Sequence, residues 1–170
     1  VQLFFPFLQR VGVLWQTGQL NPAYEHFMSN LIRQKLIVAT DSLLVPFDEK
    51  KSRFVLFLPE GEMHELGLLF ANYIIRSRGH QSLYLGQNLA YTELDALVSQ
   101  YSPTHLMAVV TATPPRQSVQ EFVSRLGERF SKQTIVLTGI QITHAHGLRV
   151  PANVRVMNTF DDFVRYVSMN

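Results

Sequence analysis

The sequence predicts an α/β protein in which a doubly wound parallel sheet of five strands follows a shorter helical segment. Three observations lead to this prediction. Short apolar runs recur along residues 54–170, and a stretch with helical periodicity follows each of them. The runs are apolar throughout, as in strands that helices cover on both faces. Residues 1–46 instead show apolar residues at helical spacing.

The first strand is expected at residues 54–58, an apolar pentapeptide that ends before the turn Pro59-Glu60-Gly61. Because parallel strands are joined by right-handed crossovers, the remaining pattern predicts a flavodoxin-like order of 2-1-3-4-5. His80 and His105 stand just before two of the strands and are expected in turns. The other strands are expected at 82–85, 105–110, 133–137 and 153–157, and the helices at 64–78, 91–101, 116–130, 140–147 and 159–168.

Residues 1–46 are expected to form a helical segment of two helices. Apolar residues predict one helix around Phe7 to Trp15 and a second from Pro22 to about Leu44. Pro22 suits the first turn of the second helix, where its missing N–H costs nothing. Two helices cannot bury their apolar faces alone, so they are expected to pack on the α/β domain, on further helices or on another subunit. The polar residues 47–53 are expected to link this segment to the domain at 54–170.

The composition excludes several functions. The chain has no cysteine, which excludes disulfides, thiolate nucleophiles and cysteine-ligated metal centres. Its net charge is only +2 and its Lys and Arg residues are scattered, so the charge does not indicate nucleic-acid binding by this chain. No hydrolytic or redox residue set is visible, and no enzyme activity is expected. The apolar opening, residues 1–7, is too short to span a membrane, and a cytoplasmic protein longer than this chain is expected.

The most informative motif is formed by Glu62, His64 and Gly67. It follows the first strand and therefore lies at the carboxyl edge of the sheet, where open α/β sheets bind ligands. The carboxylate of Glu62 can hold one ring nitrogen of His64, as outer partners do for metal-bound histidines. Gly67 leaves room for something large to approach. A single imidazole suits a metal that brings its other ligands with it in a macrocycle.

This E-x-H-x-x-G segment resembles the D-x-H-x-x-G signature of flavodoxin-like cobalamin-binding domains. The resemblance implies that His64 is the lower axial ligand of cobalt, that Glu62 is its hydrogen-bonding partner, and that the nucleotide tail of the cofactor fills a slot beside the first strands. Thr138 replaces the first glycine of a Gly-Gly pair that the family has after the fourth strand. The implied cofactor site also includes Met63, Gly67, Leu85, Gly86, Thr111, Thr113, Thr138 and Gly139.

The helical segment carries a second resemblance. Trp15 is followed after nine residues by Glu25-His26, which resembles a motif in the helical cap of CarH-type light-sensing repressors of the MerR family. The resemblance implies that residues 1–46 are part of a four-helix bundle that covers the α/β domain. The resemblance implies that adenosylcobalamin is bound, that Trp15 packs where the adenosyl group lies, and that Pro22, Glu25 and His26 line its upper face. Gln16 stands where the best-known members have a second histidine, and an amide is a poorer cobalt ligand than an imidazole.

The two resemblances together imply a cobalamin-binding sensory module of a light-responsive transcriptional regulator. Photolysis would change its oligomeric state, a dimer or tetramer being expected, and with it the binding of DNA by a domain that precedes this chain. The alternative is a corrinoid protein module that carries a methyl group in a methyltransferase system. Glu62 and the spacing from Trp15 to Glu25-His26 favour the sensor. His144 and His146 are expected to be surface residues.

Overall fold

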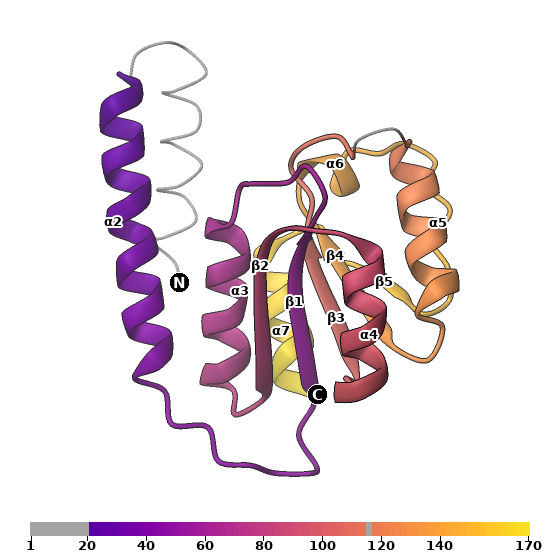
Figure 1. The fold of residues 1–170 in the computed structure, drawn as a ribbon, viewed down its shortest axis with the longest axis horizontal. Helices are drawn as coiled ribbons and strands as arrows, with labels where there is room; N and C mark the ends of the chain where they lie inside the picture. Colours follow the sequence, from indigo (N-terminus) through magenta and orange to yellow (C-terminus); the bar gives the residue numbers. More distant parts are fainter. Residues whose placement is uncertain (1–20, 115–116) are drawn as a thin grey trace.

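The computed structural model describes residues 21–114 and 117–170. It shows a sheet of five parallel strands in the order β2-β1-β3-β4-β5, with helices on both of its faces (Figure 1). The predicted fold class and strand order are therefore confirmed. The strands are β1 (Arg53–Pro59), β2 (Gln81–Leu89), β3 (His105–Val109), β4 (Thr134–Thr138) and β5 (Val154–Val156), and the helices are α2 (Pro22–Asp41), α3 (Leu66–Ser77), α4 (Tyr91–Tyr101), α5 (Val119–Arg129), α6 (Ile140–Thr143) and α7 (Phe160–Met169).

The core has two halves, one on each face of the sheet. Side chains alternate between the faces along a strand, so Leu56 of β1 packs with α3 and α7 while Phe57 packs with α4 and α5. Because both faces are buried, every residue from Phe54 to Leu58 is buried. This is why the first strand appears in the sequence as an unbroken apolar run.

Helix α2 runs beside α3, and its first turns extend past the start of α3 (Figure 1). It begins where the sequence predicts, with Pro22 in its first turn and the Asn21 side chain accepting from the backbone N–H of Ala23. Leu36 is buried against α3, while Tyr24 and Phe27 are exposed. The helix ends at Asp41 rather than near Leu44. The predicted first helix, with Trp15 and Gln16, lies outside the described residues.

Three further helices begin or end at residues other than those predicted. Helix α3 begins at Leu66, not at His64, because the Glu62 side chain accepts the backbone N–H of His64 and holds that residue in the preceding loop. Helix α6 ends at Thr143 instead of residue 147. Helix α5 begins later than predicted, at Val119, where Ser118 and Glu121 form a capping box.

The side chains of His80 and His105 are both buried. His80 lies in the connection between α3 and β2, whereas His105 belongs to β3 and not to a turn, which corrects its prediction. His105 is the first residue of β3, its ring stacks on Phe54, and its Nε2 lies 2.9 Å from the hydroxyl of Tyr166. The Nε2 of His80 lies 2.9 Å from the carbonyl oxygen of Val167. The end of α7 thus covers both rings, and burial lowers both pKa values, that of His105 to about 4.

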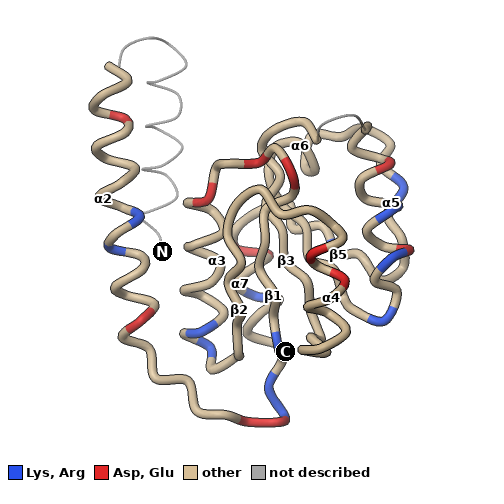
Figure 2. The backbone as a smooth tube through the Cα atoms, viewed as in Figure 1, with Lys and Arg blue, Asp and Glu red and all other residues tan. Residues whose placement is uncertain are grey.

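The charges of the described residues are interspersed. Glu and Arg residues alternate along α5 (Figure 2). None of the described helices is both long and apolar enough to cross a membrane.

Candidate functional site at the carboxyl edge of the sheet

His64 lies in the loop between β1 and α3, at the carboxyl edge of the sheet. The end of β2 supports this loop: Asn88 accepts the backbone N–H of Gly61, and the Gln87 amide donates to the carbonyl of Met63. The His64 side chain is 73% exposed. The loop is therefore fixed through its backbone while the imidazole extends from it toward solvent.

Glu62 is the centre of the loop's hydrogen bonds and is only 1% exposed. Its Oε1 accepts from the backbone N–H of His64 at 2.9 Å and lies 2.7 Å from the ring Nδ1 of His64. Its Oε2 accepts from the backbone N–H groups of Thr111 and Ala112, each at 2.6 Å, and from the Thr111 hydroxyl at 2.9 Å. One buried carboxylate thus joins the loop after β1 to the loop after β3.

These contacts keep Glu62 ionised. Burial by itself would raise the pKa of the carboxyl group, but the backbone N–H donors of His64, Ala112 and Thr111 outweigh it and lower the pKa to about 2. An ionised carboxylate can only accept, so Nδ1 of His64 must carry the proton in the contact between them. In the neutral ring the free lone pair is then on Nε2. Histidine binds metals in this neutral form.

The predicted residues of the loop after β3 have different surroundings. Thr111 uses both its backbone N–H and its hydroxyl on Glu62, a contact that sequence reasoning missed. Thr113 is exposed, two residues further along the same edge. Thr111 therefore shapes the loop, while Thr113 is the hydroxyl that remains toward solvent.

Gly139 and Thr138 follow β4 at the same edge. The backbone of Gly139 has φ +107° and passes so close to β3 that an added Cβ would lie 2.3 Å from the carbonyl oxygen of Val110. Thr138 donates its hydroxyl to the carbonyl of Met157 at 2.8 Å. Its side chain is therefore bonded toward the segment after β5, which accounts for how the branched residue fits.

Gly139→Ala is expected to destabilise the domain by roughly 2–3 kcal/mol, because it combines a backbone clash with a conformation that costs L-residues energy. Gly147→Ala is the matched control, since Gly147 has φ +69° but nothing within 4 Å of its added Cβ. The control should cost only about 1 kcal/mol. Urea unfolding of the two variants measures the difference, and equal losses would contradict a role for the contact with Val110.

The remaining predicted residues of the α/β domain also lie at this edge. Gly86 has φ +81° and stands in β2 where the pairing shifts, Leu56 facing Tyr84 and Phe57 facing Gly86, so that Leu85 is the extra residue of a bulge. Met63 is exposed beside His64. An added Cβ on Gly67 would meet Val109 at 3.4 Å, so this glycine lets α3 pack closely on β3. Met63 and His64 are thus the exposed predicted residues of the loop after β1.

The predicted residues of α2 lie in its first turns, and their hydrogen bonds stay within the helix in the described part of the chain. Glu25 accepts from the Ser29 hydroxyl at 2.8 Å, and its other oxygen lies 3.7 Å from Nδ1 of His26. His26 is 77% exposed. Pro22 is exposed at the helix start.

Sequence reasoning missed a second group of contacts beside His64. Glu65 accepts from Arg33 of α2 and, at 3.0 Å, from the hydroxyl of Tyr84 in β2. No local pattern indicates these contacts, because Arg33 lies 32 residues before Glu65. Among the described residues, no group of three or more His, Asp or Glu side chains could hold a metal ion.

The fold and this site define a class: flavodoxin-like domains that present a single histidine, held by a carboxylate, at the carboxyl edge of the sheet. The HTH-type transcriptional repressor CarH of Myxococcus xanthus is 27% identical over 147 residues, which are 85% of this chain and 48% of the repressor. The resemblance to CarH predicted from the sequence is confirmed, and the chain spans about half the length of that relative. No protein-family model matches the chain.

Solved structures confirm the fold. A cobalamin-binding protein from Desulfitobacterium hafniense matches with a TM-score of 0.53 and 16% identity, over 94% of this chain and 75% of that one. The monomethylamine corrinoid protein of Methanosarcina barkeri matches with a TM-score of 0.67 and 13% identity, over 95% and 77%. The methanol:cobalamin methyltransferase complex MtaBC of the same organism matches with a TM-score of 0.55 and 17% identity, over 94% and 61%.

Proposed function

We propose that this chain is the cobalamin-binding sensory module of a light-responsive transcriptional regulator. The observation that carries the proposal is the contact between the buried Glu62 and Nδ1 of His64, which leaves Nε2 free on an exposed ring. His64 would be the lower ligand of cobalt and Glu62 its outer partner. The similarity to CarH over 85% of the chain supports the assignment to a regulator.

The remaining residues at the carboxyl edge would surround the cofactor. Met63, Gly67, Leu85, Gly86, Thr113 and Gly139 are proposed to border the corrin or its nucleotide tail, with Thr111 and Thr138 shaping the loops behind them. Trp15, Pro22, Glu25 and His26 are proposed to cover the upper face from the helical segment, residues 1–46. That segment, the linker 47–53 and the domain 54–170 are the proposed units of the chain.

Bound adenosylcobalamin would supply a visible absorption and a cobalt–carbon bond that light breaks. The chain would need two conformations that bind the intact and the photolysed cofactor with different affinities. A ligand shifts such an equilibrium only by its difference in affinity for the two conformations. We propose that the resulting movement of the helical segment changes the oligomeric state, a dimer or tetramer. We also propose that DNA is bound by a domain preceding this chain. A cytoplasmic, non-enzymatic protein follows from this proposal.

A second candidate function is a corrinoid protein that carries a methyl group between methyltransferases. The structural matches to the monomethylamine corrinoid protein and to the methanol:cobalamin methyltransferase complex favour it. Light separates the two functions: a sensor changes its oligomeric state on illumination, whereas a methyl carrier has no reason to do so.

His64→Ala tests the ligand. In the dark, wild-type protein mixed with adenosylcobalamin should acquire the spectrum of a base-off, histidine-ligated cobalamin. His64→Ala should bind at least about 100-fold more weakly, since loss of an outer partner alone costs about 10–100-fold. His146→Ala is the matched control, because His146 is exposed on the loop after α6. Binding that is equal in all three proteins would refute His64 as the ligand.

The sensor function is tested separately by size-exclusion chromatography of the loaded protein before and after green light. A shift in elution volume is expected. Identical profiles, with tight binding retained, would favour the methyl carrier over the sensor.

A further inference from the structure

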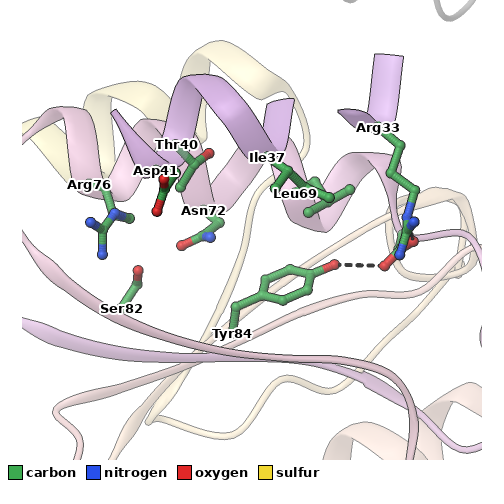
Figure 3. Close-up of a pocket in the computed structure, with 10 residues that line it drawn as sticks. Arg33, Ile37, Thr40, Asp41, Leu69, Asn72, Arg76, Ser82 and Tyr84 are labelled. Atoms are coloured by element: carbon green, nitrogen blue, oxygen red, sulfur yellow. Dashed lines mark hydrogen bonds and ion pairs between the residues drawn. The ribbon is translucent and has the colours of Figure 1, made fainter. Parts of the chain in front are cut away.

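Glu65 connects three elements next to His64. It is the residue that follows His64 and the one that precedes the first turn of α3. Its Oε1 accepts from the guanidinium of Arg33, which projects from α2, and its Oε2 accepts from the hydroxyl of Tyr84 in β2. Arg33, Glu65 and Tyr84 line a cavity of about 400 Å³ between α2, α3 and β2. Figure 3 shows the side chains of Arg33 and Tyr84 extending toward the same point at one end of this group of residues.

This contact differs from an ordinary surface ion pair. The side chain of Glu65 is only 12% exposed, whereas that of Arg33 is 49% exposed. Burial and the neighbouring carboxylate raise the pKa of Tyr84, so its hydroxyl stays a neutral donor. A partly buried carboxylate with two donors from different elements is held more firmly than an exposed pair. The Glu65 side chain does not cap α3, and its hydrogen bonds go instead to Arg33 and Tyr84.

The segment that carries His64 is thereby held on both sides. Glu62, two residues before the histidine, is bonded to the loop after β3, and that contact stays within the α/β domain. Glu65, directly after the histidine, is bonded to α2. A displacement of α2 relative to α3 therefore acts on the backbone position next to His64.

We infer that Glu65 is a positioning residue for His64, and that the ion pair of Glu65 with Arg33 transmits the position of α2 to the imidazole. The same pair would transmit a change at the ligated imidazole back to α2, because coupling between two sites is reciprocal. The ion pair of Glu65 with Arg33 would thus regulate the proposed cobalamin site. In this respect the inference rests on the proposed function.

Arg33→Ala, Glu65→Gln and the double variant test this inference without cobalamin. In isotope-labelled protein, the ¹³Cε1 relaxation of His64 reports how rigidly its ring is held. Both single variants should increase the ring's mobility. The double variant should match Glu65→Gln, because Arg33 acts through its contact with Glu65 and the two effects are then not additive. Arg33→Lys keeps the charge and should recover most of the wild-type rigidity.

The matched control is Arg165→Ala, which removes an exposed arginine that pairs with Asp162 on α7. It should leave the His64 signal unchanged, and thermal unfolding shows that all variants are folded. Release of hydroxocobalamin from the single variants should be about fivefold faster than from wild type. Unchanged ring mobility, or additive effects in the double variant, would overturn the inference. If the wild type binds no cobalamin, the proposed function fails, and the relaxation data still decide whether Glu65 positions His64.

Discussion

Glu62→Gln is expected to lower the free energy of unfolding by about 3 kcal/mol, although it changes only one oxygen into an amide. Both carboxylate oxygens accept from backbone N–H groups: Oε1 from His64, and Oε2 from Thr111 and Ala112. Whichever way the glutamine amide turns, its NH₂ group faces a backbone donor in a buried place. At least one N–H is then left without an acceptor, which is the costly case for a buried polar group.

The control for this prediction is Glu121→Gln. Glu121 also accepts from a backbone N–H, that of Ser118, but it is exposed at the start of α5, where water can replace the lost bond. Urea unfolding at pH 7 should show a large loss for Glu62→Gln and little change for Glu121→Gln. Similar small losses in both variants would mean that the buried network does not hold the two loops together.

A loss of stability in mild acid is the second large effect expected. His80 and His105 are buried and neutral, and burial followed by the mutual repulsion of the two rings lowers the pKa of His105 to about 4. The unfolded chain takes up protons at the ordinary histidine value near 6.5, so it binds more protons than the folded state below that pH. The contribution of His105 is thus fully present above pH 6.5 and is lost as the pH falls to about 4, up to about 3 kcal/mol.

Urea unfolding from pH 7.5 to pH 4.5 measures this loss. His105→Gln keeps a polar side chain near Tyr166 without a titrating ring, so its stability should fall less steeply over this range than that of the wild type. His146→Gln should keep the wild-type slope, because His146 is exposed. Equal slopes in all three proteins would show that the buried rings do not govern the acid response.

The sequence carries most of the information about the sheet. Strands buried on both faces need apolar residues at every position, as from Phe54 to Leu58, and this pattern does not depend on distant contacts. The two buried histidines could not be recognised in this way. Their partners, Val167 and Tyr166, lie 87 and 61 residues further along the chain, and only the folded packing of α7 brings them over the rings.

The candidate site was likewise predictable only where its contacts are local. The pairing of Glu62 with His64 spans two residues and follows from their spacing after a strand. The other half of the Glu62 network joins residues 49 and 50 positions apart, and depends on β1 and β3 being neighbours in the sheet. Helical periodicity predicts that α3 starts two residues earlier than it does. The pattern of apolar residues gives no sign that the Glu62 side chain accepts the backbone N–H of His64.

The five donors gathered by Glu62 have one further consequence. The His64 loop is ordered during folding, so its entropic cost does not arise during binding. The loop is therefore preorganised for a ligand. The contacts of Glu62 stay within the loops after β1 and β3, so they do not lead to α2. The described contact that leads from the His64 loop to α2 is the ion pair of Glu65 with Arg33.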